Sequence, residues 1–156
     1  MFHHILIPTD GSVLSQNAIE YGIALAKAIN TKVTAMTVSA PFRMFAIEPG
    51  LLAETPEQYH VRMKALAAKY LGVAKDAAEA AGVSCNMIHM EHDHPHEAII
   101  DTATQQRCDL IVMASHGRRG ISAIVLGSET VKVLTHSTIP VLIFRAPRPS
   151  TLFAAT

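Results

Sequence analysis

Apolar residues follow two different periods along this chain, and the switches between them divide it into strands and helices. Short apolar runs that end at turn residues predict strands. The first and fourth runs are unbroken, which is typical of strands buried on both faces of a sheet. The predicted strands are residues 3–9, 32–38, 83–90, 109–114 and 140–144.

Helical spacing begins directly after the first predicted strand. Ser12 is a candidate N-cap, because its hydroxyl can accept a hydrogen bond from a free backbone N–H of the first turn. Apolar residues then recur every three or four positions, so this segment is expected to bury one face. The positions expected on that face are Leu14, Ala18, Tyr21, Leu25 and Ile29.

Start and stop signals bound the second helix. After an irregular linker over residues 39–54, Thr55 and Gln58 have the spacing of a capping box, with Pro56 at the first helical position. The alanine-rich segment that follows runs to residue 81, and Gly82 is its C-terminal stop. Two more helices are predicted over residues 95–106 and 127–134. The buried face expected for the first of these two is Ala98, Ile99, Thr102 and Ala103.

The alternation of strands and helices predicts the fold class. It favours an α/β fold, a doubly wound open sheet of five parallel strands with helices on both faces. Right-handed crossovers suit the strand order 3-2-1-4-5. In that order the connections after strands 1 and 4 leave in opposite directions, so a ligand-binding crevice is expected beyond their carboxyl ends. We expect one domain over residues 1–146 and a C-terminal tail over 147–156, which lacks periodicity.

Composition adds limits on location and partners. Of 156 residues 49% are hydrophobic, and 13 Lys and Arg balance 13 Asp and Glu, so neither nucleic acid nor a membrane surface is an expected partner. No apolar run is long enough to cross a bilayer, and the N-terminus does not resemble a signal peptide. Cys85 and Cys108 are expected to be buried free thiols. These features predict a cytoplasmic protein.

The most informative stretch is ASHGRRGISAIVLGSET, residues 114–130, which follows the fourth strand. Gly117 and Gly120 would let the backbone approach a ligand closely. The next helix begins near Gly127 and Ser128, where free N–H groups and the helix dipole attract anions. Asp10 could accept a hydrogen bond from a ribose hydroxyl or an adenine amine. The alternative from spacing alone is that the glycines make turns and that Ser128 only caps a helix.

The whole chain, from ILIPTDGS to IPVLIF, resembles a universal stress protein domain. Nucleotide-binding members of that family carry the pattern G-x2-G-x9-G-[S/T] after strand 4. Gly117, Gly127 and Ser128 match it at the correct spacing, and Ala114 stands in place of the first glycine. The resemblance implies a protein that binds ATP, ADP or AMP, with Mg²⁺ accompanying ATP. It also implies a homodimer formed through the edge strand at residues 140–144.

The resemblance further implies which residues bind the nucleotide. Pro8, Thr9 and Asp10 would line the adenosine, and Val38 would contact adenine largely through its backbone. The ribose and phosphate side after strand 4 would be formed by Met113, Ala114, His116, Gly117 and Arg118. The donors facing the phosphates would come from Gly127, Ser128, Glu129 and Thr130, with the Glu129 carboxylate turned away.

Other candidate chemistry is weaker. Residues 92–97, HDHPHE, hold three histidines and two carboxylates, and either a metal site or a solvated loop at a helix start fits this pattern. A phosphoacceptor role for Asp10 lacks the acidic pair and the lysine that response regulators need. The favoured function is a nucleotide-responsive regulatory module acting in stress adaptation. A slow ATPase or phosphotransfer enzyme using the same pocket, and a protein-interaction module that binds no nucleotide, are the alternatives.

Overall fold

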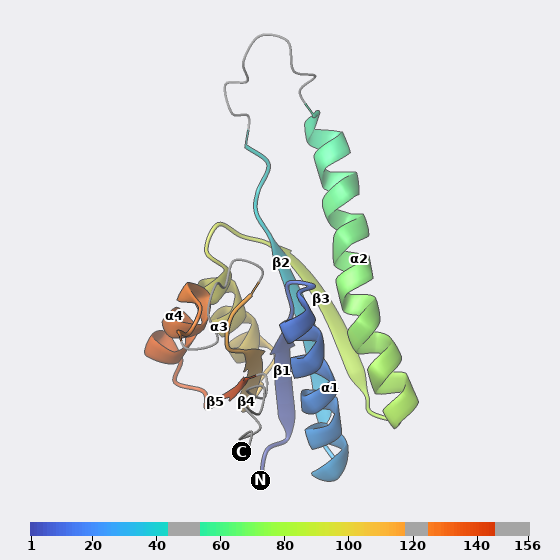
Figure 1. The fold of residues 1–156 in the computed structure, drawn as a ribbon, viewed down its shortest axis with the longest axis vertical. Coiled ribbons are helices and arrows are strands. Elements are labelled where there is room, and N and C mark those ends of the chain that lie inside the picture. Colours follow the sequence, from blue (N-terminus) through green and yellow to red (C-terminus); the bar gives the residue numbers. More distant parts are fainter. Residues whose placement is uncertain (44–53, 118–124, 146–156) are drawn as a thin grey trace, which may run out of the picture.

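Five parallel strands in the order β3-β2-β1-β4-β5 form the sheet, as predicted. The structure is a computed structural model that describes residues 1–43, 54–117 and 125–145. Figure 1 shows the arrangement of the elements around the sheet. Their bounds are β1 (His4–Pro8), α1 (Val13–Ala28), β2 (Lys32–Ser39), α2 (Pro56–Ala81), β3 (Cys85–Glu91), α3 (Pro95–Gln105), β4 (Leu110–Ala114), α4 (Ser128–His136) and β5 (Val141–Phe144).

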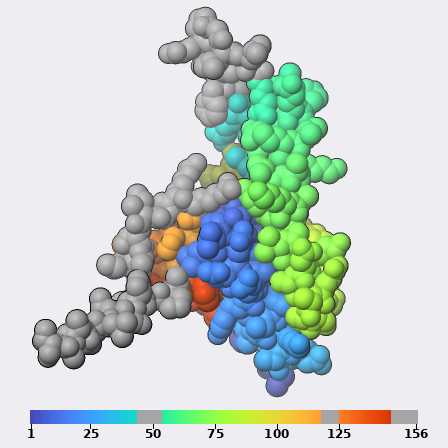
Figure 2. Space-filling view, turned by 45° about the vertical axis from the view of Figure 1, so that its right-hand side comes forward, coloured from blue at the N-terminus to red at the C-terminus, as the bar shows by residue number. Residues whose placement is uncertain are grey.

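Helices cover both faces of the sheet, because successive side chains of a strand point to opposite faces. Ile5 and Ile7 of β1 pack with α1 and α2, whereas Leu6 packs with α3 and α4. All three side chains are fully buried. Helices α1 and α2 lie side by side on one face, and the N-terminal half of α2 extends beyond the sheet (Figures 1 and 2).

The predicted helix caps are confirmed. The Ser12 side chain accepts a hydrogen bond from the Ser15 N–H at the start of α1. Thr55 and Gln58 form both hydrogen bonds of the capping box that begins α2. Gly82 ends α2 in the left-handed conformation, with φ at 70°. Local sequence therefore specifies where these two helices begin and where α2 ends.

Tyr21 corrects the predicted buried face of α1. Its side chain is 47% exposed, and its ring lies 5.7 Å from the Phe144 ring on β5, measured between centroids. The adjacent Gly22 packs against the sheet instead, where a Cβ atom would come within 2.5 Å of Ile7 Cδ1. The buried face of α1 therefore includes Gly22 and not Tyr21. Its members are Leu14, Ser15, Ala18, Ile19, Gly22, Ile23 and Ala26.

The two cysteines differ in environment. Cys108 is buried, as predicted, and burial raises the pKa of its thiol to about 11. Cys85 is only half-buried, because β3 is an edge strand and much of it faces solvent. Burial also raises the pKa of the Cys85 thiol. Both thiols are therefore protonated at neutral pH, which disfavours a role as a nucleophile.

One histidine is part of the core. His4 is 6% exposed at the start of β1, and its Nε2 lies 2.8 Å from Thr34 Oγ1 on β2. The Nδ1 atom of the same ring lies 3.0 Å from the Gln106 carbonyl oxygen. Burial, followed by the charge of Lys32, lowers the pKa of His4. The ring is therefore held neutral between the first strand and the end of α3.

Two of the predicted segments lie wholly or partly outside the described residues. These are the linker, of which residues 44–53 are not described, and the C-terminal tail at 147–156. Among the helices that the structure does describe, none has both the length and the apolar composition required to cross a bilayer.

Candidate functional site

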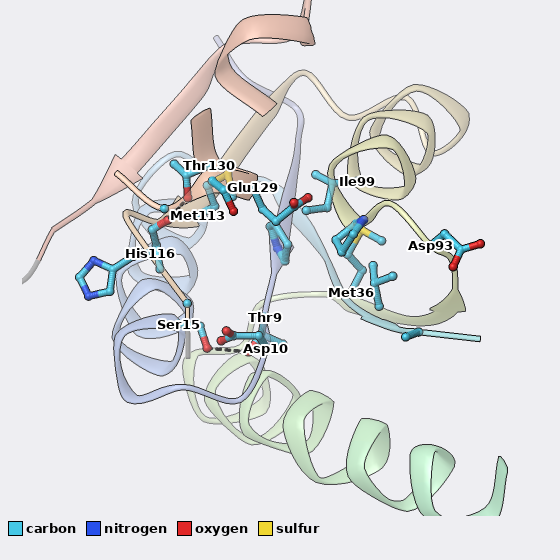
Figure 3. Close-up of a pocket in the computed structure, with 18 residues that line it drawn as sticks. Thr9, Asp10, Ser15, Met36, Asp93, Ile99, Met113, His116, Glu129 and Thr130 are labelled. Carbon is cyan, nitrogen blue, oxygen red and sulfur yellow. Dashed lines mark hydrogen bonds between the residues drawn. The ribbon is translucent and has the colours of Figure 1, made fainter. Parts of the chain in front are cut away.

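A pocket of about 590 Å³ opens where β1, β2 and β4 end, and this volume lies in the range of small-molecule sites (Figure 3). Every predicted site residue that the structure describes lines it. These residues are Pro8, Thr9, Asp10, Val38, Met113, Ala114, His116, Gly117, Gly127, Ser128, Glu129 and Thr130. Arg118 lies outside the described residues. The fold thus brings together residues that are far apart in the sequence.

The loop after β1 is held by its own polar groups. Thr9 is buried, and its hydroxyl lies 3.0 Å from the Ser15 hydroxyl and accepts a hydrogen bond from the Gly11 N–H. Asp10 Oδ1 accepts a hydrogen bond from the Ser12 N–H, at 3.0 Å. These bonds place the Asp10 carboxylate at the pocket wall, next to the start of α1.

Gly117 packs directly against that carboxylate. A Cβ atom at position 117 would come within 2.3 Å of Asp10 Oδ2. The φ angle of Gly117 is not in the left-handed region, which glycine alone adopts readily. The glycine is therefore required by the close approach of the loops after β1 and β4, and not by a turn of positive φ.

Gly127 also allows a close approach, in this case between the start of α4 and the loop after β4. Its N–H donates a hydrogen bond to the Ser115 carbonyl at 2.8 Å. A Cβ atom at this position would lie 3.0 Å from His116 Cα, which is tighter than an ordinary contact. Since this neighbour is backbone, a larger residue would have to separate the two segments. Gly127 thereby fixes the start of α4 against the end of β4.

The first turn of α4 faces the pocket. Gly127 is the N-cap of α4, and Ser128 is therefore the first helical residue and not the cap. No side-chain capping bond is made. The first N–H groups of a helix have no partner within the helix, and they carry the positive end of its dipole. The Thr130 hydroxyl donates to the Ala114 carbonyl at 3.1 Å, which leaves Ser128 as the exposed hydroxyl of this turn.

Glu129 turns its carboxylate toward α3. Its Oε2 accepts a hydrogen bond from the His96 N–H at 2.9 Å and lies 3.2 Å from His96 Nδ1, while Oε1 accepts from Lys132 Nζ at 3.1 Å. Partial burial favours the neutral acid, but the hydrogen bonds from Lys132 and His96 outweigh it and lower the pKa of Glu129. The side chain is therefore an anion at neutral pH.

Apolar side chains form part of the wall of the pocket. Met36 and Ile99 are almost completely buried and line it together with Val38 and Met113. Sequence reasoning missed part of this wall, since Met36 and Ile99 carry only the ordinary signature of core residues. The lining residues that were not predicted are Ser15, Met36, Ala40, Asp93, Pro95 and Ile99. An apolar part of a ligand fits this environment.

His116 does not direct its ring into the pocket. The ring lies on the outer side of the β4 loop, away from the other labelled residues (Figure 3). Its Nδ1 lies 3.2 Å from the Ser115 hydroxyl. His116 lines the pocket near its backbone contact with Gly127, so it is placed to shape the loop.

The histidines at 92, 94 and 96 follow one another along the approach to α3. Ring centroids of His92 and His94 are 6.1 Å apart, as are those of His94 and His96. The His94 N–H donates to His92 Nδ1, and His96 contacts Glu129. Among the described residues no group of three His, Cys, Asp or Glu side chains is arranged to hold a metal ion.

The fold and the pocket can be compared with known proteins. A family model described as the universal stress protein family matches residues 1–145. The chain belongs to the universal stress protein family. It is 32% identical over 151 residues to universal stress protein MJ0531 of Methanocaldococcus jannaschii, covering 95% of this chain and 85% of that protein. Universal stress protein YxiE of Bacillus subtilis is 31% identical over 149 residues, covering 93% of this chain and 100% of that protein.

Solved structures share the fold of this universal stress protein. The protein MJ0577 has a TM-score of 0.78 at 24% identity, covering 96% of this chain and 99% of that chain. A universal stress protein in complex with cAMP has a TM-score of 0.66 at 25% identity, covering 92% and 97%. One from Archaeoglobus fulgidus in complex with dAMP has a TM-score of 0.62 at 17% identity, covering 90% and 96%. The last two proteins bind adenine nucleotides.

Proposed function

We propose that this universal stress protein binds an adenine nucleotide in the pocket beyond β1 and β4 and acts as a regulatory module in the cytoplasmic stress response. The observation that carries the proposal is the convergence of the predicted site residues on one pocket at the carboxyl ends of the strands. Ligands of open α/β sheets bind at this position. The complexes of related proteins with cAMP and dAMP support the same class of ligand.

The apolar and the polar groups of the pocket suit the two ends of a nucleotide. Adenine would lie against the apolar wall formed by Met36, Val38, Ile99 and Met113. The ribose hydroxyls would donate to the Asp10 carboxylate, which lies between the loops after β1 and β4. A carboxylate is a strong acceptor for hydroxyl donors, and such charged hydrogen bonds contribute about 1.5–3 kcal/mol.

The phosphate would bind at the start of α4. Gly127 and Ser128 line the pocket there, and the free N–H groups of the first turn form an anion site of the kind that helix N-termini supply. The Ser128 hydroxyl would add a donor. Ser128→Ala is therefore expected to weaken AMP binding by about 0.5–3 kcal/mol, the upper end applying if the acceptor is a charged phosphate oxygen.

Calorimetry and thermal unfolding with AMP, ATP and cAMP test the proposal. A ligand that binds only the native state raises the melting temperature. The matched control is Val131→Ala, since Val131 lies on the same helix, is exposed and does not line the pocket. If saturating nucleotide with Mg²⁺ changes neither measurement, the proposed function is wrong. Turnover of labelled ATP distinguishes a binding module from a slow ATPase.

We further propose a homodimer formed through β5. This strand lies at the edge of the sheet, and its four residues are half-buried. A second copy paired with it would satisfy backbone groups that an edge strand leaves open. Sedimentation velocity at micromolar concentration is expected to give the mass of a dimer. A monomeric mass would contradict this proposal.

A further inference from the structure

The charge of Glu129 is unexpected for a residue beside a phosphate site. Glu129 follows Ser128 in the first turn of α4 and lines the same pocket. An acidic residue in the first turn stabilises its own helix, but its charge repels an anion bound at the same helix end. The charge of Glu129 therefore bears on how strongly the pocket binds anionic ligands.

The structure holds this carboxylate in one place. Helix α3 has no side-chain capping bond of its own, since its N-cap residue, His94, makes none. Glu129 supplies the missing acceptor from α4, because its Oε2 accepts the hydrogen bond from the His96 N–H. The positive end of the α3 dipole and the Lys132 ammonium further favour the ionised form. Glu129 thus joins the starts of two helices.

The charged groups next to Glu129 do not fully neutralise its carboxylate. The Glu97 carboxylate lies 3.9 Å from His96 Nε2, and the Glu97 side chain is 53% exposed and does not line the pocket. Lys132 compensates part of the Glu129 charge, and its side chain is 47% exposed. Exposed cations are strongly screened by solvent, so this compensation is incomplete.

We propose that Glu129 is a specificity-determining residue, which lowers the affinity of the pocket for a nucleoside triphosphate relative to a nucleoside monophosphate. The inference rests on the proposed function. A triphosphate carries about two more negative charges than a monophosphate. With the first phosphate at Ser128, its additional phosphoryl groups would also lie near the first turn of α4 and would add to the charge that Glu129 repels. The favoured ligand class is an adenosine compound with a single phosphate.

The magnitude follows from Coulomb's law. With the dielectric constant of bulk water, two unit charges about 8 Å apart interact by an amount that corresponds to about 2.4-fold in affinity, and two added charges give about sixfold. The smaller effective dielectric constant at a protein surface makes this a lower limit. Removal of the charge in Glu129→Gln preserves the size of the side chain and one acceptor oxygen. It is expected to tighten the binding of both nucleotides, and to tighten ATP binding about threefold to tenfold more than AMP binding, because ATP carries about two more negative charges.

Calorimetric titration with AMP and with ATP, without Mg²⁺, tests the proposal on the wild type and two variants. Glu97→Gln is the matched control, because it removes a neighbouring carboxylate that does not line the pocket. The ratio of the two affinities should shift in Glu129→Gln and not in Glu97→Gln. The shift should also shrink as salt is raised from about 0.05 to 0.5 M, since ions screen the repulsion.

Three results would overturn the inference. An unchanged ATP-to-AMP affinity ratio in Glu129→Gln shows that the charge does not act on the ligand. An equal shift in Glu97→Gln shows that net charge, and not the position of Glu129, is responsible. Failure of the wild type to bind both AMP and ATP overturns the proposed function itself, and the specificity inference with it. Thermal unfolding of each variant without ligand separates these outcomes from loss of fold.

Discussion

Replacement of Gly117 by alanine is expected to weaken nucleotide binding through Asp10. The added Cβ would lie 2.3 Å from Asp10 Oδ2, whereas ordinary contacts begin near 3.4 Å, so the carboxylate must move by about 1 Å (3.4 − 2.3 = 1.1). A shift of this size breaks a hydrogen bond that depends on a separation of about 2.7–3.0 Å. The ribose would thereby lose its proposed charged acceptor.

The expected loss is about 1.5–3 kcal/mol, which corresponds to roughly 10-fold to 150-fold in the Kd for AMP. Folding should be affected much less, because the displaced atom is the end of a side chain and not backbone. Calorimetry measures the affinity, and urea unfolding measures the stability. Gly72→Ala is the control, since no atom lies near an added Cβ at that position, and an alanine there should stabilise α2 by about 0.5–1 kcal/mol without changing affinity.

A double-mutant cycle with Asp10→Ala tests the cause. If Gly117→Ala acts by displacing the Asp10 carboxylate, it should add little once that carboxylate is gone. Two outcomes would refute the reasoning. One is wild-type affinity in Gly117→Ala, and the other is a pair of losses that simply add in the double variant.

Three further predictions concern stability. Gly82→Ala should lower the free energy of unfolding in urea by about 1–2 kcal/mol, because φ is positive at this position although no atom lies near the added Cβ. Gly11→Ala should cost at least about 1 kcal/mol more, because φ is positive there too and the added Cβ would lie 2.2 Å from the Tyr70 ring. Equal costs would contradict this prediction. Burial lowers the pKa of His4 from 6.5, so the unfolded chain binds the proton more readily and stability falls as pH decreases below about 6.5. When the pH falls from about 7.5 to 5.5, the free energy of unfolding should decrease less for His4→Gln than for the wild type. Parallel curves of unfolding free energy against pH would refute this prediction. Thr55→Ala removes the capping box and should cost about 0.5–2 kcal/mol in the same unfolding assay, whereas an unchanged midpoint would show that the cap is dispensable.

Features that depend on neighbours in the sequence could be predicted from the sequence alone. The periods of apolar residues located the strands and helices, and the chemistry of Ser12, Thr55 and Gly82 located their ends. Right-handed crossover connections restrict the order of parallel strands, and the predicted order is the one that the sheet has. The glycine and serine spacing after β4, read together with the resemblance to universal stress proteins, indicated the segment that lines the pocket.

Contacts between segments far apart in the sequence were decided only by the tertiary structure. No local pattern shows that Gly117 packs on Asp10, that Glu129 caps α3, or that Ile99 completes the apolar wall. The same holds for Tyr21, whose position is compatible with the helical period and yet lies outside the core. Periodicity specifies which face of an element is apolar, but the rotation and register at which elements pack determine which side chains meet.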